Sequence, residues 1–177
     1  MKILEHCCYT RYLNEWYATH GDTDSINLIN FGDHTLTELL DWCINMCIGH
    51  DPITVTIAMP HISPDTRTWL TSHKYIHHLN LLTSSEANTP TLPIEGEMSQ
   101  SDREGLNIQE AHVPGLHTQI ATVSGGGRHF VLQGNLLQAV SPGKYITTLG
   151  LTQRYYDTIQ PMLQSWIRTY SRKAHHT

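Results

Sequence analysis

Residues 35–59, TLTELLDWCINMCIGHDPITVTIAM, hold a helix signal and a strand signal in one short stretch. Thr35 and Glu38 have capping-box spacing, because the Thr35 hydroxyl can accept the Glu38 amide while the Glu38 carboxylate reaches back. The helix that follows has an apolar stripe consisting of Leu36, Leu39, Leu40, Cys43 and Cys47. After Pro52, residues 53–59 alternate apolar and small side chains, which predicts a core strand.

The same alternation of helix and strand extends on both sides of this stretch. Residues 1–24 carry aromatic side chains at spacings that favour a short amphipathic helix, and residues 25–31 read as a first strand. Ser63 as cap with Pro64 at the first helical position predicts a second helix, and residues 75–82 predict a third strand. Because strands joined by helices pair in parallel, we expect an α/β fold with a mixed, mainly parallel sheet and helices on both faces.

The chain changes character after the third strand. Residues 83–114 are rich in Ser, Thr, Glu, Pro and Gly, which is typical of a flexible insertion on the surface. Residues 117–123 and 128–133, joined by three glycines, predict a β-hairpin with a loose turn that extends the sheet. The last helical pattern lies within residues 152–173, and its firm part is expected from Pro161 onward.

Length and composition indicate one ordinary globular domain over residues 1–177, with 39% hydrophobic and 15% charged residues. No apolar run has the length needed to cross a bilayer, and the N-terminus lacks the apolar centre of a signal peptide. We therefore expect no membrane partner and a cytoplasmic location. A formal charge of -5 argues against a large basic surface, so strong nucleic-acid binding is not expected.

The cysteines and histidines do not form a recognisable site. Cys7 and Cys8 are adjacent, whereas Cys43 and Cys47 lie on the apolar stripe of the first capped helix, so all four are interpreted as reduced thiols. The 13 histidines are scattered and lack ligand spacing. The sequence accordingly predicts no metal site and no cofactor.

The hairpin carries the one candidate for chemistry. His117-Thr118-Gln119-Ile120 begins its first strand and Gln133-Gly134-Asn135 ends the second. In this order and spacing the chain resembles half of a phospholipase D-like phosphodiesterase, whose pattern is His-x-Lys on one strand, then an Asp, then Gly-Ser-x-Asn after the next. The resemblance covers the architecture of residues 25–172. It places His117 on the family's nucleophilic histidine, which would attack phosphorus and form a phosphohistidine.

The other positions depart from that pattern. Gln119 stands where the phosphate-binding lysine belongs, Ser124 or the glycines occupy the Asp region, and residues 134–137, Gly-Asn-Leu-Leu, replace Gly-Ser-x-Asn. Phosphoryl transfer is catalysed largely by cations and donors that stabilise charge on the equatorial oxygens, and a neutral amide supplies no such charge. Its loss costs on the order of a thousandfold in rate. Gln119 and Asn135 still donate hydrogen bonds, and Lys144 is a lone cation expected near the site.

Three functions stay open at this level. The first is a catalytically impaired phospholipase D-like domain that binds a phosphate-containing ligand or supports assembly. The second is an active phosphodiesterase or nuclease that uses His117 in an altered site. The third keeps the fold without the family, so that His117 is a strand-entry residue and Gln119 a polar residue of the sheet. Active members of the family bring two His-x-Lys motifs together, so the resemblance also implies a homodimer with a two-fold axis near the site.

Overall fold

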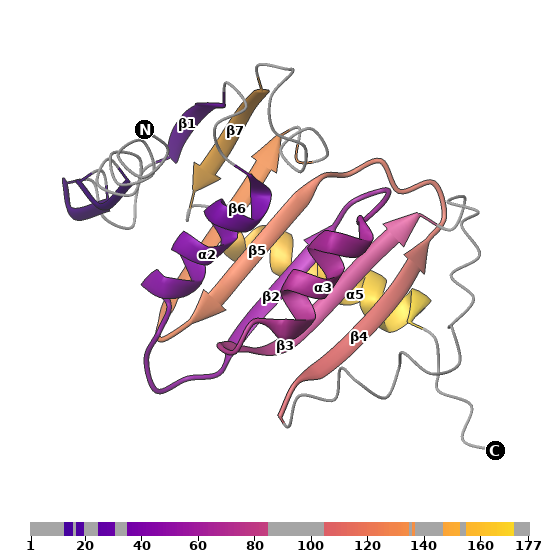
Figure 1. Ribbon diagram of the computed structural model, residues 1–177. Helices are drawn as coiled ribbons and strands as arrows, with labels where there is room; N and C mark the ends of the chain where they lie inside the picture. The colour runs from indigo at the N-terminus through magenta and orange to yellow at the C-terminus, as the bar shows by residue number, and fades with distance from the viewer. Residues whose placement is uncertain are drawn as a thin grey trace.

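The computed structural model describes residues 13–15, 17–19, 25–30, 35–84, 105–134, 136, 147–152 and 155–171. Within this part of the chain the strands form one seven-stranded sheet in the order β1-β7-β6-β5-β2-β3-β4 (Figure 1). The strands are β1 Ser25–Asn30, β2 Ile53–Ala58, β3 Ile76–Ser84, β4 Asn107–Val113, β5 Ile120–Gly125, β6 Arg128–Gly134 and β7 Thr147–Thr152.

The sheet has a parallel part and an antiparallel part. Strand β3 pairs in parallel with β2 and with β4, whereas β1–β7, β7–β6, β6–β5 and β5–β2 are antiparallel. The expected mixed α/β architecture is confirmed, but the expectation of a mainly parallel sheet is wrong. Residues 126–127 alone connect β5 to β6, and a parallel crossover needs a dozen or more residues, so this half of the sheet must reverse direction.

Helices cover both faces of the sheet, as the sequence predicts. Helices α2 Leu36–Met46 and α3 Pro64–Ser72 lie on one face, and α5 Tyr156–Tyr170 lies on the other (Figure 1). The capping box of α2 is formed, since the Thr35 amide donates to Glu38 Oε2 at 3.0 Å and the Glu38 amide donates to Thr35 Oγ1 at 3.3 Å. Ser63 caps α3 with Pro64 in its first turn. Local sequence signals therefore position both helices.

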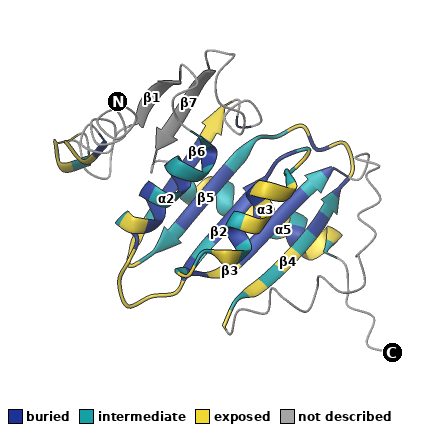
Figure 2. Cartoon of the chain, in the orientation of Figure 1, coloured by how far each residue is buried: buried dark blue, intermediate teal, exposed yellow. Residues whose placement is uncertain are grey.

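The buried residues form two hydrophobic clusters, one on each face of the sheet (Figure 2). The larger cluster lies under α2 and includes Leu40, Val55 and Phe130, and the smaller cluster lies under α5. Leu13 is fully buried in the larger cluster, and the ring of Tyr17 lies 5.8 Å from that of Phe130, so the described part of the expected N-terminal helix packs on the domain.

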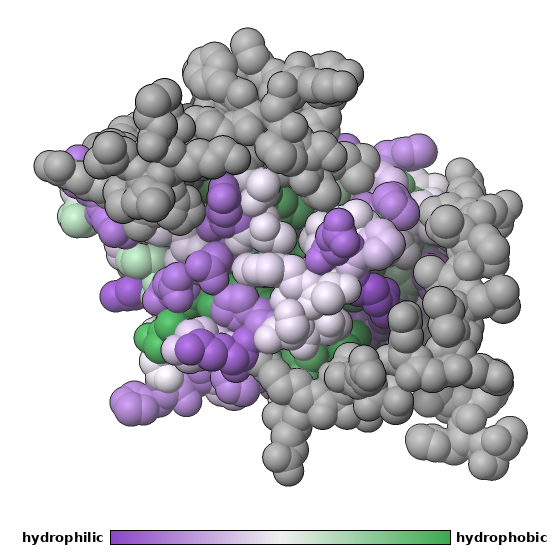
Figure 3. All heavy atoms as spheres, viewed as in Figure 1, coloured by the Kyte–Doolittle hydropathy of each residue, from purple (hydrophilic) through white to green (hydrophobic). Residues whose placement is uncertain are grey.

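On the outer surface of α2 and α3, hydrophilic and near-neutral residues predominate (Figure 3). The described helices include none with the length and apolar character needed to cross a membrane.

The bounds of β4 and α5 differ from the sequence-based expectation. Residues 107–113, expected to lie in the flexible insertion, form the edge strand β4. Because this strand contains few large apolar residues, the sequence signal for it is weak. Helix α5 begins at Tyr156 rather than at Pro161. The proline removes one helical hydrogen bond, but Leu163 and Ile167 bury the helix against the sheet and hold the preceding turn in place. Residues 85–104 lie outside the described ranges.

Candidate functional site

The loop of residues 114–119 crosses the carboxyl ends of the parallel strands. Strand β4 ends at Val113, which pairs with Ser84 at the end of β3, and β5 begins at Ile120, which pairs with Ala58 at the end of β2. Because β3 lies between β4 and β2, the loop must pass the carboxyl end of β3. In α/β folds this edge of the sheet is the usual place for a ligand.

His117 and Gln119 lie in this loop, not on a strand. The strand expected to begin at His117 begins at Ile120, because the chain first makes a turn in which the Leu116 amide donates to the Val113 carbonyl at 3.3 Å. The Leu116 side chain is buried in the cluster under α5 and anchors the loop. His117 is exposed and Gln119 is half-buried. The imidazole is therefore accessible to a ligand from solvent.

The end of β6 lies at the same edge. Gln133 pairs with Ile120, and Gly134 follows it as the last residue of β6. The two segments that the sequence predicts to form one site are thus adjacent in the backbone. Asn135 and Lys144 lie outside the described residues, so their place in the site stays a prediction, as do the roles of His117 and Gln119.

Ser124 and the three glycines lie at the other end of the hairpin. Ser124 pairs with Thr54 at the start of β2, four residues along β5 from Ile120, which corresponds to about 13 Å of strand. The residues in the Asp region of the resemblance therefore do not contact a ligand held beside His117.

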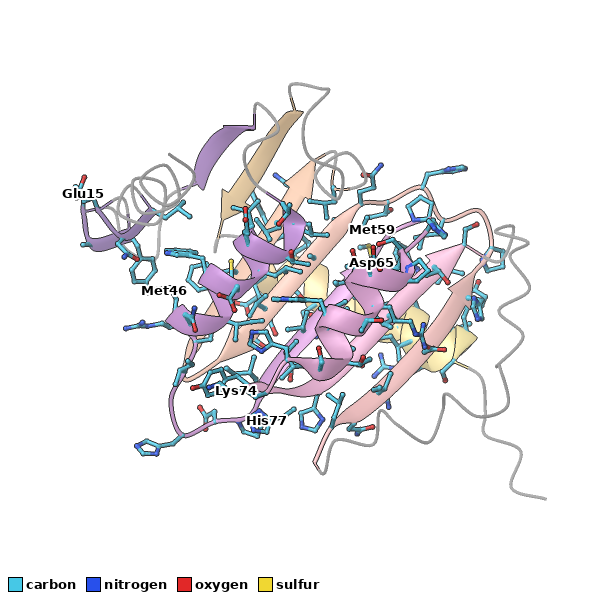
Figure 4. All side chains as sticks on the ribbon, viewed as in Figure 1. Glu15, Met46, Met59, Asp65, Lys74 and His77 are labelled. Atoms are coloured by element: carbon cyan, nitrogen blue, oxygen red, sulfur yellow. The ribbon has the colours of Figure 1, made fainter. Side chains whose placement is uncertain are left out.

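Among the residues that the structure describes, the carboxyl edge carries no fixed positive charge. Among its described segments, residues 58–63, 83–84 and 112–119, no lysine or arginine occurs, although three histidines do. Met59 and Asp65 mark this end of the sheet in Figure 4, and Lys74 and His77 mark the opposite end.

The described side chains around this edge include one ion pair and one histidine contact. The Arg67 guanidinium in α3 donates to Glu110 in β4, and burial lowers the pKa of Arg67. Thr83 Oγ1 and His112 Nδ1 are 3.1 Å apart. The described part of the chain contains no cluster of His, Cys, Asp and Glu suited to a metal ion. The edge thus offers imidazoles, amides and hydroxyls.

Comparison with solved structures identifies the fold. A phospholipase D family member, Nuc from Salmonella typhimurium, superposes with a TM-score of 0.51 and 11% identity, over 84% of this chain and 97% of that chain. NucT from Helicobacter pylori gives a TM-score of 0.51 and 11% identity, over 85% of this chain and 99% of that chain. The chain has a phospholipase D-like fold. No protein-family model and no curated protein matches the sequence.

The phospholipase D-like fold confirms the resemblance at the level of architecture. At 11% identity the superposition shows the fold alone. The order of His117, Gln119 and Gly134 around one hairpin is the signal that predicted it.

A second group of residues was missed by sequence reasoning. Polar side chains of β2, β3, β4 and α5 line a hollow on the α5 face of the sheet, namely Thr54, His78, Asn80, Asn107, Gln109 and Gln164. Alternating polar residues along each strand were visible in the sequence, but their alignment across strands depends on the register of the sheet.

Proposed function

We propose that this phospholipase D-like domain binds a phosphate-containing ligand beside the loop of residues 114–119 and does not hydrolyse it at the rate of an intact family site. The observation that carries the proposal is Gln119, a neutral amide two residues after the exposed His117, at an edge whose described residues include no lysine or arginine. His117, Gln119 and Asn135 would donate hydrogen bonds to phosphate oxygens, and Lys144 would add a cation.

The proposed impairment has a simple electrostatic cause. A phosphate ester in the ground state is held by several hydrogen bonds, which imidazole and amide groups supply. The transition state carries charge spread over three equatorial oxygens, and its stabilisation depends on preorganised cations. Replacing an ammonium group by the Gln119 amide therefore weakens catalysis far more than it weakens binding.

A direct test compares phosphate binding by four proteins. We expect inorganic phosphate, titrated into the full-length chain and followed by NMR, to bind about fivefold more weakly to His117→Ala and about tenfold more tightly to Gln119→Lys, since a charged donor contributes more than a neutral one. His50→Ala, an exposed histidine beyond α2, serves as the control and should bind like the unmodified chain. Equal affinity in all four proteins would refute the proposed site.

The second candidate function is an active phosphodiesterase or nuclease. The exposure of His117 at the carboxyl edge favours it, because an attacking imidazole must reach phosphorus. Hydrolysis of an activated phosphodiester and of single- and double-stranded DNA, compared between the unmodified chain and His117→Ala, decides between the two. We expect no turnover from either protein, whereas turnover that His117→Ala abolishes would establish the enzyme.

We also propose that the domain is a homodimer that places two copies of the loop of residues 114–119 close to one another. One chain contains one such loop, and a two-fold axis near it would let two His117 side chains approach the same ligand. A dimer would also double the number of neutral donors around a single phosphate group.

A further inference from the structure

The α5 face of the sheet is divided into polar and apolar rows. The register aligns Thr54 with His78, and His78 with Asn107, in one row across β2, β3 and β4. The next row aligns Thr56, Asn80 and Gln109. The third aligns Ala58, Leu82 and Ala111, which belong to the buried cluster under α5. Helix α5 therefore seals the apolar row and leaves the polar rows beside it.

The polar rows form a hollow at the end of the sheet remote from His117. Its volume is about 220 Å³, and α5 contributes Gln164 to its lining. Since one water molecule occupies about 30 Å³, the space equals roughly seven waters or one small heterocycle. It lies at the starts of β2, β3 and β4, whereas the phosphate site proposed above lies at their carboxyl ends.

Asn80 connects this hollow to the interior. Asn80 is only 5% exposed. Within the described residues its side chain makes one hydrogen bond, in which Nδ2 donates to Thr56 Oγ1 at 3.0 Å. A carboxamide has two donor hydrogens and an acceptor oxygen, so the acceptor and one donor of Asn80 remain for a group in the hollow. A buried polar group with spare capacity is costly unless a ligand or water satisfies it.

The lining has a defined chemical character. Four of its six side chains are planar carboxamides, one is a planar imidazole and one is a hydroxyl, and none carries a permanent charge. A carboxamide presents a donor and an acceptor side by side, which matches the edge of a nucleobase. Adenine N6 and N7 in particular form paired hydrogen bonds with one Asn or Gln side chain. A phosphate group would find no cation here, and a sugar offers no planar edge to pair with.

We propose that this hollow is a binding site for a nucleobase, with adenine as the best match, held by Asn80, Gln109 and Gln164. The site does not depend on the proposed phosphate site, because the two lie at opposite ends of β2. A single ring system of this size makes few contacts, so the dissociation constant is expected on the order of millimolar.

The test uses adenosine, which has no phosphate. It is titrated into the full-length chain, and binding is followed by NMR of the backbone and side-chain amides. We expect saturable shifts in the side-chain amides of Gln109 and Gln164, and at least about fivefold weaker binding in Gln109→Ala and in Gln164→Ala. Gln109 is exposed and Gln164 is half-buried, so neither substitution threatens the fold. Asn45→Ala, an exposed amide on α2, is the matched control and should bind like the unmodified chain.

Two further arms separate this proposal from the others. His117→Ala should bind adenosine with unchanged affinity, and ribose alone should produce no saturable shifts. The proposal is overturned if adenosine gives no saturable shift up to its solubility limit, if ribose binds as well as adenosine, or if the double variant Gln109→Ala with Gln164→Ala binds adenosine normally. Loss of adenosine binding in His117→Ala would likewise contradict a separate site.

Discussion

Cys47 is the C-cap residue of α2 and is buried in the core. Its thiol donates to the Arg128 carbonyl at 3.8 Å, and Arg128 Nη1 donates to the Met46 carbonyl at 2.8 Å. Cys43, one turn earlier, is fully buried. Burial raises the pKa of Cys47 to about 11 and raises that of Cys43 well above its ordinary value. Both cysteines are free, as the sequence predicts, whereas Cys7 and Cys8 lie outside the described residues.

These raised pKa values predict inert thiols in the folded protein. Because the thiolate is the reactive form, iodoacetamide at pH 8 should leave Cys43 and Cys47 unmodified until the protein is unfolded in urea. Mass spectrometry of the peptides that contain each cysteine measures the outcome. Rapid modification of either peptide in the native protein would contradict the burial of these side chains.

The same pKa shift predicts how stability depends on pH. The folded state keeps the Cys47 proton up to a pKa of about 11, whereas the unfolded state releases it near 9.0. The Cys47 contribution to the free energy of unfolding is therefore constant below pH 9 and falls as pH rises toward 11. Urea unfolding at several pH values should show a shallower alkaline decline in Cys47→Ala than in the unmodified chain. Identical declines would count against the shift.

At the scale of elements, the β5–β6 turn is tight where the sequence suggested a loose one. Gly126 and Gly127 have positive φ values of 58° and 74°, the pattern of a two-residue hairpin turn. The turn packs on the end of α2, so a Cβ atom on Gly126 would lie 2.8 Å from the Cys47 carbonyl oxygen. A Cβ atom on Gly127 would meet nothing within 4 Å. The glycines thus serve packing and turn geometry.

This difference predicts unequal effects for two neighbouring substitutions. Gly127→Ala should lower the free energy of unfolding by about 1 kcal/mol, because only the backbone strain of a positive φ is added. Gly126→Ala should lower it by at least about 2 kcal/mol, because the contact with Cys47 forces α2 and the turn apart. Urea unfolding measures both. Equal losses would show that the turn does not press against α2.

At the scale of the whole molecule, the sheet separates two candidate sites by the length of β2. The loop that carries His117 lies at the carboxyl end, where a two-fold axis could bring two copies together. The polar hollow lies at the opposite end, on the α5 face, and is lined by side chains of one chain. Assembly is therefore expected to affect the first site and to leave the second unchanged.

The proposed dimer predicts a molar mass twice the 20.1 kDa of one chain. Size-exclusion chromatography with light scattering measures it across a dilution series. A molar mass equal to that of one chain at every concentration would contradict the proposed dimer. Phosphate binding by the monomer would then be tested by the His117 and Gln119 variants alone. Adenosine binding should be the same at all concentrations, which distinguishes the two sites.

The sequence by itself determined the elements whose causes are local. The Thr35–Glu38 capping box, the Ser63 cap with Pro64 and the alternation along β2 each depend on residues within a few positions of one another, and all three are confirmed. The order of His117, Gln119 and Gly134 was enough to suggest the phospholipase D-like fold. The neutral side chain at position 119 is likewise a property of the sequence.

Only the tertiary structure decided the rest. Strand β4 holds its place by pairing with β3, α5 continues ahead of Pro161 because its apolar side chains are buried on the sheet, and the antiparallel half follows from a two-residue turn. The hollow exists because register aligns Thr54, His78 and Asn107 across three strands. These features depend on contacts between residues far apart in the chain, whose energies have no counterpart in any local stretch of sequence.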